Sequence, residues 1–286
     1  MELGETISQL RKEKNISIKD LCSDRLSRSA YTRFINNETD TSSTNFLFFL
    51  DRLQVSLNEF MFVKNDYKLS ENERYMIKLQ IFYLDENLLE LEKIEKDCAF
   101  LSKSINDTFK HLSLLSNIYQ SRIKNKPIDI NIIEHLKNYL INVDTWTHYE
   151  IILFNNSMFI YNIEFIELIL RRATSGLDRY HPIRSYTSES FAMLSNVLNI
   201  YLSSKELHKA NKLFKNMISK ELPEDLVRER LHLAFYDALI TLILHKDSSG
   251  HIKIQQVLNI CDFLNMDNSY KGYSKLYVFL CNLYNL

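Results

Sequence analysis

Glycine and proline are scarce in this chain, with four and three residues respectively among 286. A fold rich in β-hairpins would need more of both, because these residues form most tight turns. No segment alternates apolar and polar residues as a half-buried strand does. Long stretches instead repeat apolar residues every three to four positions. The chain is 45% hydrophobic and 12% aromatic, which is ample for a buried core. We therefore predict an all-α protein.

The residue types that carry catalysis or bind metals are not grouped in the sequence. The eight histidines are scattered, and the sequence has no HExxH motif, no CxxC motif and no Gly-rich phosphate-binding loop. We expect no catalytic residue, metal site or cofactor, and the protein is not expected to be an enzyme. The four cysteines are also far apart, which favours reduced, buried thiols and a cytoplasmic location. They are Cys22, Cys98, Cys261 and Cys281.

The chain also lacks an uninterrupted apolar run and an excess of charge of one sign. Its most apolar stretch, Ile151 to Leu170, is broken by three asparagines and two glutamates, and the N-terminus has no signal-peptide core. No membrane span is expected. The net charge is −1, and residues 1–64 contain nine basic and nine acidic residues. Any affinity for nucleic acid must therefore come from the local placement of Arg and Lys.

The first 65 residues predict a bundle of five short helices. The first helix ends near Lys14, and Ser17 caps a second that ends before a turn at 23–26. A third helix is expected over 28–35, with Ser27 as its N-cap and Asn37 in the left-handed conformation that ends it. Two further helices are expected over 43–53 and 57–63. The second and third helices have the spacing of a helix-turn-helix.

The third helix has one apolar and one polar face. Leu26, Tyr31 and Phe34 would turn towards a small core. Four short polar or guanidinium side chains would then face outward, and they are Arg28, Ser29, Thr32 and Arg33. Such a face is what a helix needs to read bases in a DNA major groove. Solvated arginines on an ordinary helical bundle are the alternative interpretation.

Two motifs in this region resemble known regulators. LRKEK-x-IS-x-x-DL followed by LS-x-S-x-Y-x-RF is similar to XRE/Cro-type helix-turn-helix domains. S-x-S-x-x-T-RF and L-x-EF-x-F resemble the Rgg/GadR/MutR regulators of Gram-positive bacteria. The resemblance implies that the four outward residues face bases of double-stranded DNA. It also implies a set of residues near phosphates, namely Lys14, Ser17, Lys19, Asn36 and Thr39.

The chain departs from this family's pattern at two positions. Ile35 stands where many relatives have a glutamate that pairs with an arginine matching Arg11, and Ile18 stands where many have glutamine. Without the glutamate, Arg11 is expected to be free and available for DNA. The loss of the glutamine would remove one contact that positions the domain on phosphate.

Residues 66–286 predict a second domain made of helix pairs. We expect pairs at about 71–86 with 88–104, 106–124 with 129–143, 145–162 with 163–176, 186–203 with 205–220 and 224–246 with 251–265, followed by a last helix over 270–286. Pro127, Pro182 and Pro223 fall between helices. A weak repeat at a spacing of 40 aligns Asn156 with Asn196 and Tyr236. Degenerate tetratricopeptide-like pairs of this kind are expected to stack into a right-handed superhelix.

The segment D-x-W-x-x-YEIILF-x-N, with Trp146 and Tyr149, again resembles Rgg-type regulators, as does N-x-x-x-x-Y with a later Ala210. The resemblance implies a homodimer whose helical domain senses a short imported signalling peptide, as in quorum sensing. From helical spacing, Trp146 and Tyr149 are expected to be core residues. The last helix is a candidate dimer surface through Tyr273, Leu276, Phe279, Leu280 and Leu283.

Asparagine suits a peptide site because its amide both donates and accepts hydrogen bonds and can pair with a peptide backbone. Asn156 and Asn196 are the leading candidates. Their neighbours Asn155 and Asn199 would face the peptide instead if the helices are rotated differently about their axes. Further candidates are Tyr236 and three arginines that could bind a carboxylate, Arg171, Arg228 and Arg230. Alternatively, these asparagines bond one another or the backbone between helices.

Two other functions remain open from the sequence. The chain could be a helical-repeat adaptor for a protein partner, with the N-terminal bundle serving only dimerisation. It could also be an XRE-type regulator without a peptide ligand. An adaptor has no need of the arginine-bearing face of the third helix, so DNA binding separates these alternatives.

Overall fold

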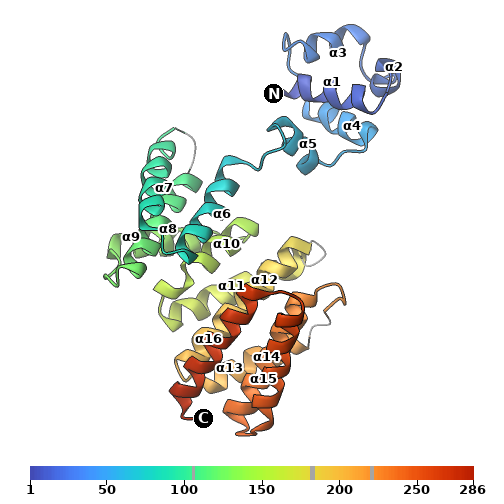
Figure 1. Ribbon diagram of the computed structural model, residues 1–286. Coiled ribbons are helices and arrows are strands. Elements are labelled where there is room, and N and C mark those ends of the chain that lie inside the picture. The colour runs from blue at the N-terminus through green and yellow to red at the C-terminus, as the bar shows by residue number, and fades with distance from the viewer. Residues whose placement is uncertain (105–106, 181–183, 220–221) are drawn as a thin grey trace. The chain divides into compact units, whose positions relative to one another are not determined.

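The computed structural model describes residues 1–104, 107–180, 184–219 and 222–286, and the side chains of these segments outside residues 174–187. Throughout these segments the chain forms α-helices and one short 3₁₀ helix, without any β-strand (Figure 1). The prediction of an all-α protein is confirmed. The helices group into two compact units, Met1–Ile123 and Lys124–Leu286.

Five short helices form the first part of the N-terminal unit, close to their predicted positions. They are α1 (Leu3–Glu13), α2 (Ile18–Cys22), α3 (Arg28–Ile35), α4 (Ser43–Leu53) and α5 (Leu57–Lys64). A serine hydroxyl accepts a backbone N–H at the start of each of the last four helices. These serines are Ser17, Ser27, Ser42 and Ser56. The predicted caps at Ser17 and Ser27 are confirmed.

An aromatic core holds α3 against α4. Tyr31 and Phe34 of α3 pack on Phe49 of α4, with ring centroids 6.0 and 6.1 Å apart. Leu21 of α2 and Phe60 of α5 are fully buried in the same cluster. The helices α1–α5, called the head below, therefore share a core of their own. The compact unit continues to residue 123, so the domain boundary at residue 65 stays a prediction.

Three longer helices, α6 (Glu71–Leu84), α7 (Leu88–Leu101) and α8 (Asp107–Ile123), complete this unit. Polar contacts join α7 to α8. Glu95 of α7 accepts hydrogen bonds from Asn117 and Gln120 of α8, at 3.0 and 2.6 Å. Ser116 of α8 donates to the carbonyl of Leu91 at 2.6 Å. These bonds satisfy the polar groups that the packing of the two helices buries.

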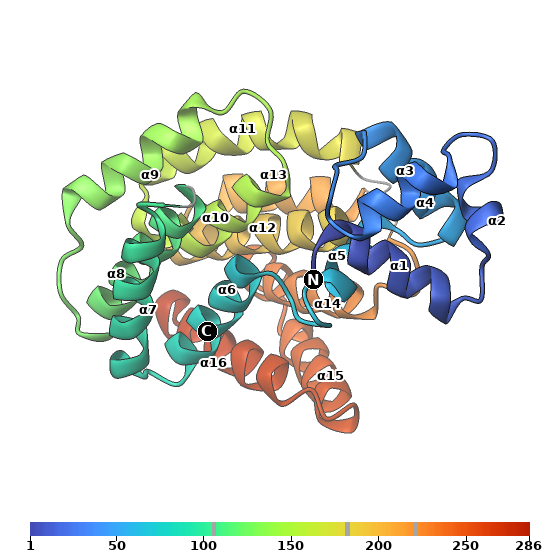
Figure 2. The ribbon, with the colours of Figure 1, turned by 90° about the horizontal axis from the view of Figure 1, so that it is seen from above.

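The second unit continues the predicted succession of helices. It contains α9 (Ile130–Asn142), α10 (His148–Ser157), the 3₁₀ helix η1 (Met158–Ile160), α11 (Ile163–Tyr180), α12 (Arg184–Ser203), α13 (Leu207–Ile218), α14 (Val227–Leu244), α15 (Ser249–Phe263) and α16 (Asp267–Tyr284). Pro127 and Pro223 lie between helices as predicted, and Pro182 lies outside the described residues. Helix α12 packs between α10 and α14 (Figures 1 and 2). The superhelix and its hand stay predictions.

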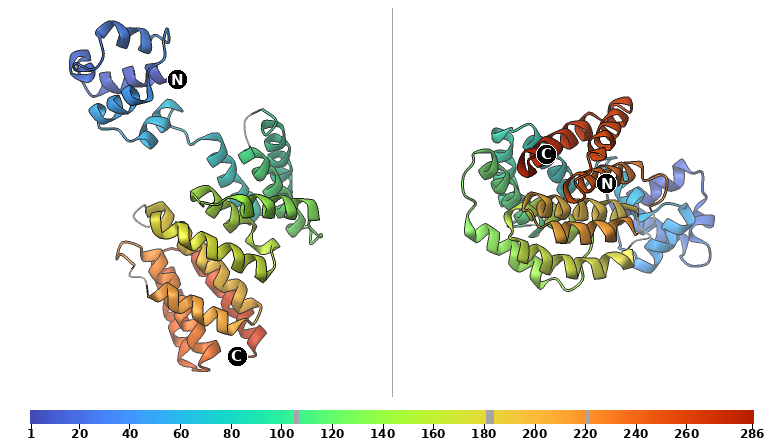
Figure 3. Two further views of the ribbon diagram at one scale, coloured as in Figure 1. Left: turned by 180° about the vertical axis from the view of Figure 1, so that it is seen from behind. Right: turned by 90° about the horizontal axis from the view of Figure 1, so that it is seen from below.

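The last three helices, α14 to α16, pack together as the orange-to-red group of Figure 3. Gly250 allows α15 to approach α14 closely, because a Cβ at this position would lie 2.7 Å from the Ala238 carbonyl oxygen. On α16, Tyr273 and Leu280 are buried inside the unit and Phe279 is exposed. The expectation that Tyr273 and Leu280 lie on a dimer surface is therefore wrong, since intramolecular packing already covers both.

Two buried residues of the motif around α10, Trp146 and Glu150, hold this segment in the core. Trp146 is 1% exposed and packs edge-on against Phe154 at 5.5 Å. Glu150 is buried and accepts hydrogen bonds from the Tyr139 hydroxyl at 2.8 Å and from the Thr147 N–H and hydroxyl. The prediction that Trp146 is a core residue is confirmed, and the motif of Trp146 and Glu150 fixes the start of α10.

No helix among the described residues has the length and hydropathy needed to cross a membrane. The described residues also contain no group of three or more side chains that could hold a metal ion.

Candidate DNA-binding face and candidate peptide site

Helix α3 presents the four predicted base-reading residues to solvent. Because Tyr31 and Phe34 point into the core, the opposite face of the helix carries Arg28, Ser29, Thr32 and Arg33, and all four are exposed. The Thr32 hydroxyl donates to the Arg28 carbonyl at 2.9 Å. Within the described chain, the guanidinium groups of Arg28 and Arg33 form no hydrogen bond or ion pair. Their donors are therefore available to an external acceptor.

The start of α2 lies beside the start of α3. Ser17, Lys19 and Arg28 line one hollow of about 570 Å³, together with Ile18, Cys22, Ser23, Leu26 and Ser27. Lys19 is exposed, whereas the Ser17 hydroxyl is engaged as the N-cap and donates to Asp20 at 2.5 Å. The structure thus brings two predicted phosphate-side residues next to a predicted base-side arginine.

The remaining predicted phosphate-side residues lie around the ends of α1 and α3. Lys14 follows α1 and is exposed, and Thr39 is half-buried. Asn36 is exposed and donates a long hydrogen bond of 3.4 Å to Glu38. Within the described residues, no further side-chain hydrogen bond or ion pair holds these residues away from a nearby phosphate.

Arg11 is not free, contrary to the expectation drawn from the missing glutamate. Its Nε donates to the Tyr31 hydroxyl at 3.2 Å, and its Nη1 donates to the Ile16 carbonyl at 2.7 Å. Burial raises the pKa of Tyr31, so its hydroxyl remains neutral and can accept. A phenol and a backbone carbonyl thus replace the carboxylate, and Arg11 holds α1 against α3 inside the head.

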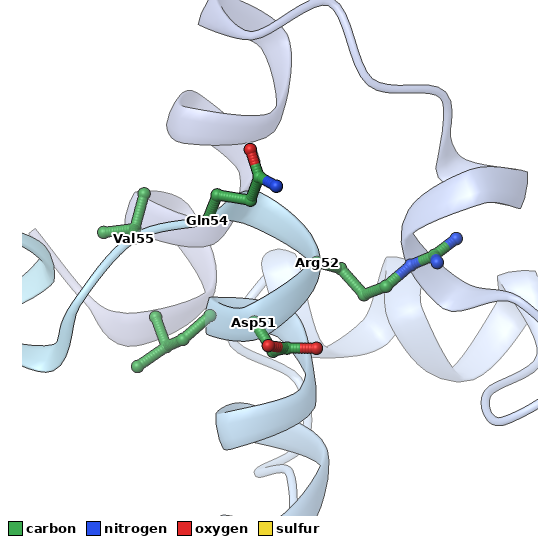
Figure 4. Close-up of a pocket in the computed structure, with 5 residues that line it drawn as sticks. Asp51, Arg52, Gln54 and Val55 are labelled. Carbon is green, nitrogen blue, oxygen red and sulfur yellow. The ribbon is translucent and has the colours of Figure 1, made fainter.

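One side chain that sequence reasoning missed, Arg52, holds α2 on α4. Arg52, in the last turn of α4, donates to the Asp20 carbonyl through Nη2 at 2.6 Å and through Nε at 3.2 Å. Figure 4 shows its side chain extended away from Asp51 and Gln54, which line a hollow of about 490 Å³ with Val55 and Leu50. A basic residue in a last helical turn is its only sequence signal, and that signal is common.

The end of α3 is fixed on α1 by contacts at Gly4, Glu5 and Asn37. Asn37 has a φ of 61° and donates through Nδ2 to the Glu5 carboxylate at 3.0 Å. Hydrogen bonds from the Glu2 N–H and then from Asn37 lower the pKa of Glu5. A Cβ on Gly4 would lie 2.2 Å from the Phe34 carbonyl oxygen. The orientation of α3 therefore depends on α1.

In the second unit, α10, α12 and α14 carry a row of polar side chains across their contacts. Asn155 of α10 donates through Nδ2 to the Glu189 carbonyl at 3.3 Å and accepts through Oδ1 from Asn196 at 3.4 Å. Asn196 is exposed and Asn155 is half-buried. The asparagines are thus bonded to one another and to the backbone, as the alternative interpretation proposed.

The row continues from α12 to α14 through Tyr236. Its hydroxyl lies 2.9 Å from Asn199 Oδ1 and 3.2 Å from the Ser195 carbonyl oxygen, within hydrogen-bond distance of both. Tyr236 is buried, and burial strongly raises its pKa, so the hydroxyl stays protonated. The buried Ser195 hydroxyl has no hydrogen-bond partner within the described residues. Tyr236 is therefore a structural neighbour of the row and not an exposed contact residue.

The other candidates lie apart from this row. Asn156 turns back along its own helix and donates to the Ile152 carbonyl at 2.8 Å. Arg230 is engaged, since it donates to the carbonyls of Leu222 and Pro223 at 2.8 and 3.2 Å. Arg171 and Arg228 are exposed on α11 and α14. The structure therefore favours Asn155, Asn196 and Asn199 over Asn156 as the centre of a polar site.

Comparison with known proteins bears on both sites. Residues 56–275 match the model of the C-terminal domain of the HTH-type transcriptional regulator Rgg. Among solved structures, a proposed transcriptional regulator from Listeria monocytogenes EGD-e is similar with a TM-score of 0.87 and 15% identity, over 99% of this chain and 98% of that one.

Two further solved structures, a pheromone receptor and PrgX, share the fold. The SHP pheromone receptor Rgg2 of Streptococcus dysgalactiae has a TM-score of 0.79 and 22% identity, over 96% of this chain and 98% of its own. PrgX in complex with cCF10 has a TM-score of 0.73 and 15% identity, over 98% and 92%. At these identities the matches show a common fold along almost the entire chain.

Proposed function

Because the chain belongs to the Rgg family of helix-turn-helix transcriptional regulators, we propose that it binds DNA through α3 and a short signalling peptide through the polar row of its second unit. The observation that carries the DNA function is the α3 face, where two unpaired guanidinium groups flank two short polar side chains. A transcriptional regulator of this kind acts by binding and needs no catalytic site.

The chemistry of the α3 face suits the major groove. Arginine can donate two hydrogen bonds to the O6 and N7 atoms of guanine, and the hydroxyls of Ser29 and Thr32 can pair with either donors or acceptors. Lys19 at the start of α2, with Lys14 after α1, would neutralise phosphates and set the position of the head. We keep Ser17, Asn36 and Thr39 as further phosphate contacts and assign Arg11 to the interior.

DNA footprinting on the region upstream of the protein's own gene tests this assignment. Arg28→Ala and Arg33→Ala should each weaken binding by about 1–3 kcal/mol, and the double variant should leave no footprint at physiological salt. Arg74→Ala removes the same charge from an exposed position of α6 and serves as the control. An unchanged footprint for the double variant would remove the DNA assignment and favour a helical-repeat adaptor.

The peptide function rests on the residues that α10 and α12 expose at their contact. A peptide that displaces water needs partners for its backbone N–H and C=O groups, and asparagine amides supply both. Asn155, Asn196 and Asn199 lie in one hydrogen-bonded row, and exposed Arg171 and Arg228 could receive a peptide carboxylate. The pheromone receptor Rgg2 and a bacterial receptor solved in complex with its peptide pheromone share the fold, and they support a peptide as the ligand class.

Fluorescence polarisation with a library of labelled apolar octapeptides tests the peptide function. The tightest binder should lose affinity in Asn196→Ala, and Asn216→Ala on α13, outside the row, is the control. If no octapeptide binds, the protein is an Rgg-family regulator tuned by another ligand or by none.

The two sites would be coupled in a cytoplasmic homodimer. Two heads can contact half-sites one helical turn of DNA apart, about 34 Å, only if the dimer presents them at that spacing. A peptide that binds one arrangement of the helical pairs better would shift the population towards that arrangement. Sedimentation equilibrium with and without the bound octapeptide measures the oligomeric state that this mechanism requires.

A further inference from the structure

Helix α13 exposes a face that carries only positive and neutral polar side chains. His208, Lys212 and Lys215 are four and three positions apart, so they lie along one side of the helix, and all three are exposed. On the opposite side, Leu213 and Phe214 are buried in the second unit. The helix contains no aspartate or glutamate. The three exposed residues, called the lysine face below, therefore have no negative charge beside them on their own helix.

The lysines of this face lack the partner that a lysine has on another helix of the same unit. Lys137 of α9 forms an ion pair with Glu134, three positions earlier, at 3.2 Å. At that spacing on α13, Lys212 follows Lys209 and Lys215 follows Lys212. Neighbouring like charges destabilise a helix, so the folding of α13 does not explain this arrangement. In the part of the chain that the structure describes, the ammonium groups of Lys212 and Lys215 form no hydrogen bond or ion pair.

The unpaired charge belongs to the lysine face and not to the whole helix. Lys209, which lies outside the face, forms ion pairs with Glu167 of α11 at 2.9 Å and with Glu206 at 3.5 Å. The sequence thus provides carboxylates where a lysine of α13 meets a neighbouring helix. It provides none where the lysines of this helix point to solvent.

The lysine face suits a polyanion better than it suits a protein partner. Interfaces between proteins are depleted in lysine and enriched in aromatic residues, whereas interfaces with DNA are polar and strongly positive. No aromatic side chain belongs to the lysine face. The head has no net positive charge with which to attract DNA, because residues 1–64 contain nine basic and nine acidic residues.

From this unpaired charge, and resting on the proposed DNA binding, we propose that the lysine face of α13 binds the phosphate backbone of double-stranded DNA. It contacts phosphates and no base edges, so it adds affinity for any sequence while α3 selects the operator. Each lysine that neutralises a phosphate releases a counterion, so the contribution of the face is measurable as a salt dependence.

Binding of the full chain to a random-sequence duplex of about 40 base pairs tests the face without requiring the operator. Fluorescence anisotropy measures the affinity at salt concentrations from about 50 to 200 mM. Lys212→Gln with Lys215→Gln removes two charges and should reduce the slope of log affinity against log salt by about 2. The loss of affinity should therefore be about tenfold greater at the lower than at the higher salt concentration.

Two paired substitutions serve as controls. Lys212→Arg with Lys215→Arg keeps both charges and should keep the slope of the wild type. Lys271→Gln with Lys275→Gln removes two exposed lysines from α16 of the same unit and should also leave the slope unchanged. Thermal unfolding followed by circular dichroism should show that the glutamine pair on α13 is at least as stable as the wild type, because it relieves repulsion between neighbouring lysines.

The outcomes distinguish this proposal from the function on which it rests. A slope that the glutamine pair on α13 leaves unchanged, or that the pair on α16 reduces as much, would overturn the proposal. If the Arg28→Ala, Arg33→Ala variant meanwhile loses the operator footprint, the DNA function stands and the lysine face fits an acidic protein surface instead. If the wild type binds neither this duplex nor the region upstream of its own gene, the DNA function is refuted and the lysine face falls with it.

Discussion

Gly4→Ala should destabilise the head although alanine favours a helix. A Cβ at this position would lie 2.2 Å from the Phe34 carbonyl oxygen and 2.8 Å from the Ile35 Cα, both backbone atoms of α3. Neither can rotate away, so α1 and α3 must separate by roughly 1 Å to reach ordinary contact. Overpacking of this kind costs about 1–3 kcal/mol, whereas replacing glycine by alanine in a helix gains at most about 1 kcal/mol.

Gly272→Ala is the matched control. Gly272 lies in α16, and a Cβ there would meet nothing within 4 Å. The substitution should therefore raise stability by about 0.5–1 kcal/mol, so the same change has opposite signs at the two sites. Urea denaturation followed by circular dichroism measures both. DNA footprinting of Gly4→Ala at a temperature where it is folded adds a functional measure, because the displaced α3 carries Arg28 and Arg33.

Three results would refute this reasoning. Gly4→Ala could be as stable as the wild type, Gly272→Ala could be less stable, or Gly4→Ala could bind its operator with unchanged affinity. The first or third would mean that α3 is not held on α1 at Gly4.

Three further predictions concern packing, hydrogen bonding and pH. Gly250→Ala would place a Cβ 2.7 Å from a carbonyl oxygen of α14 and should destabilise the second unit by about 1–3 kcal/mol. Unfolding of this unit can be followed by the fluorescence of Trp146, the only tryptophan in the sequence. Arg11→Met should destabilise the head by about 1–2 kcal/mol and leave the salt dependence of DNA binding unchanged, because Arg11 bonds Tyr31 and Ile16 and not phosphate. Burial lowers the pKa of His232 to about 4. Because the folded protein holds this imidazole neutral, the free energy of unfolding is highest above pH 6.5 and falls by up to about 3 kcal/mol as the pH drops towards 4. His232→Gln should therefore flatten the pH dependence of the urea midpoint of unfolding.

The sequence predicted the helices well, because their signals are local. Serine caps, the 3.6-residue apolar period and the prolines between helices act within a few residues of one another. Ser27, Tyr31 and Phe34 were sufficient to set the rotation of α3, and hence which residues it exposes. The base-reading candidates could therefore be identified before any tertiary contact was known.

Contacts between distant residues could not be predicted in this way. Arg11 was expected to be free because one partner was missing, but a tyrosine 20 positions away and a nearby carbonyl replace that partner. Asn156 was preferred over Asn155 because its repeat position matched Asn196. A helix turns 100° per residue, so an error of one position changes the face on which a side chain lies. Only the packing of α10 on α12 shows that Asn155 is the residue that bonds Asn196.

The energy that couples a peptide to DNA binding can come from this same small set of bonds. A tenfold change in DNA occupancy requires about 1.4 kcal/mol of difference in peptide affinity between two arrangements of the protein. One hydrogen bond contributes about 1 kcal/mol. If the peptide backbone bonds Asn196 and Asn199 in only one arrangement, two hydrogen bonds supply about 2 kcal/mol. Asn199→Ala should therefore remove about half of this energy, reduce the peptide's effect on DNA occupancy to about fivefold and leave DNA binding without peptide unchanged. An undiminished peptide response in this variant would place the coupling elsewhere.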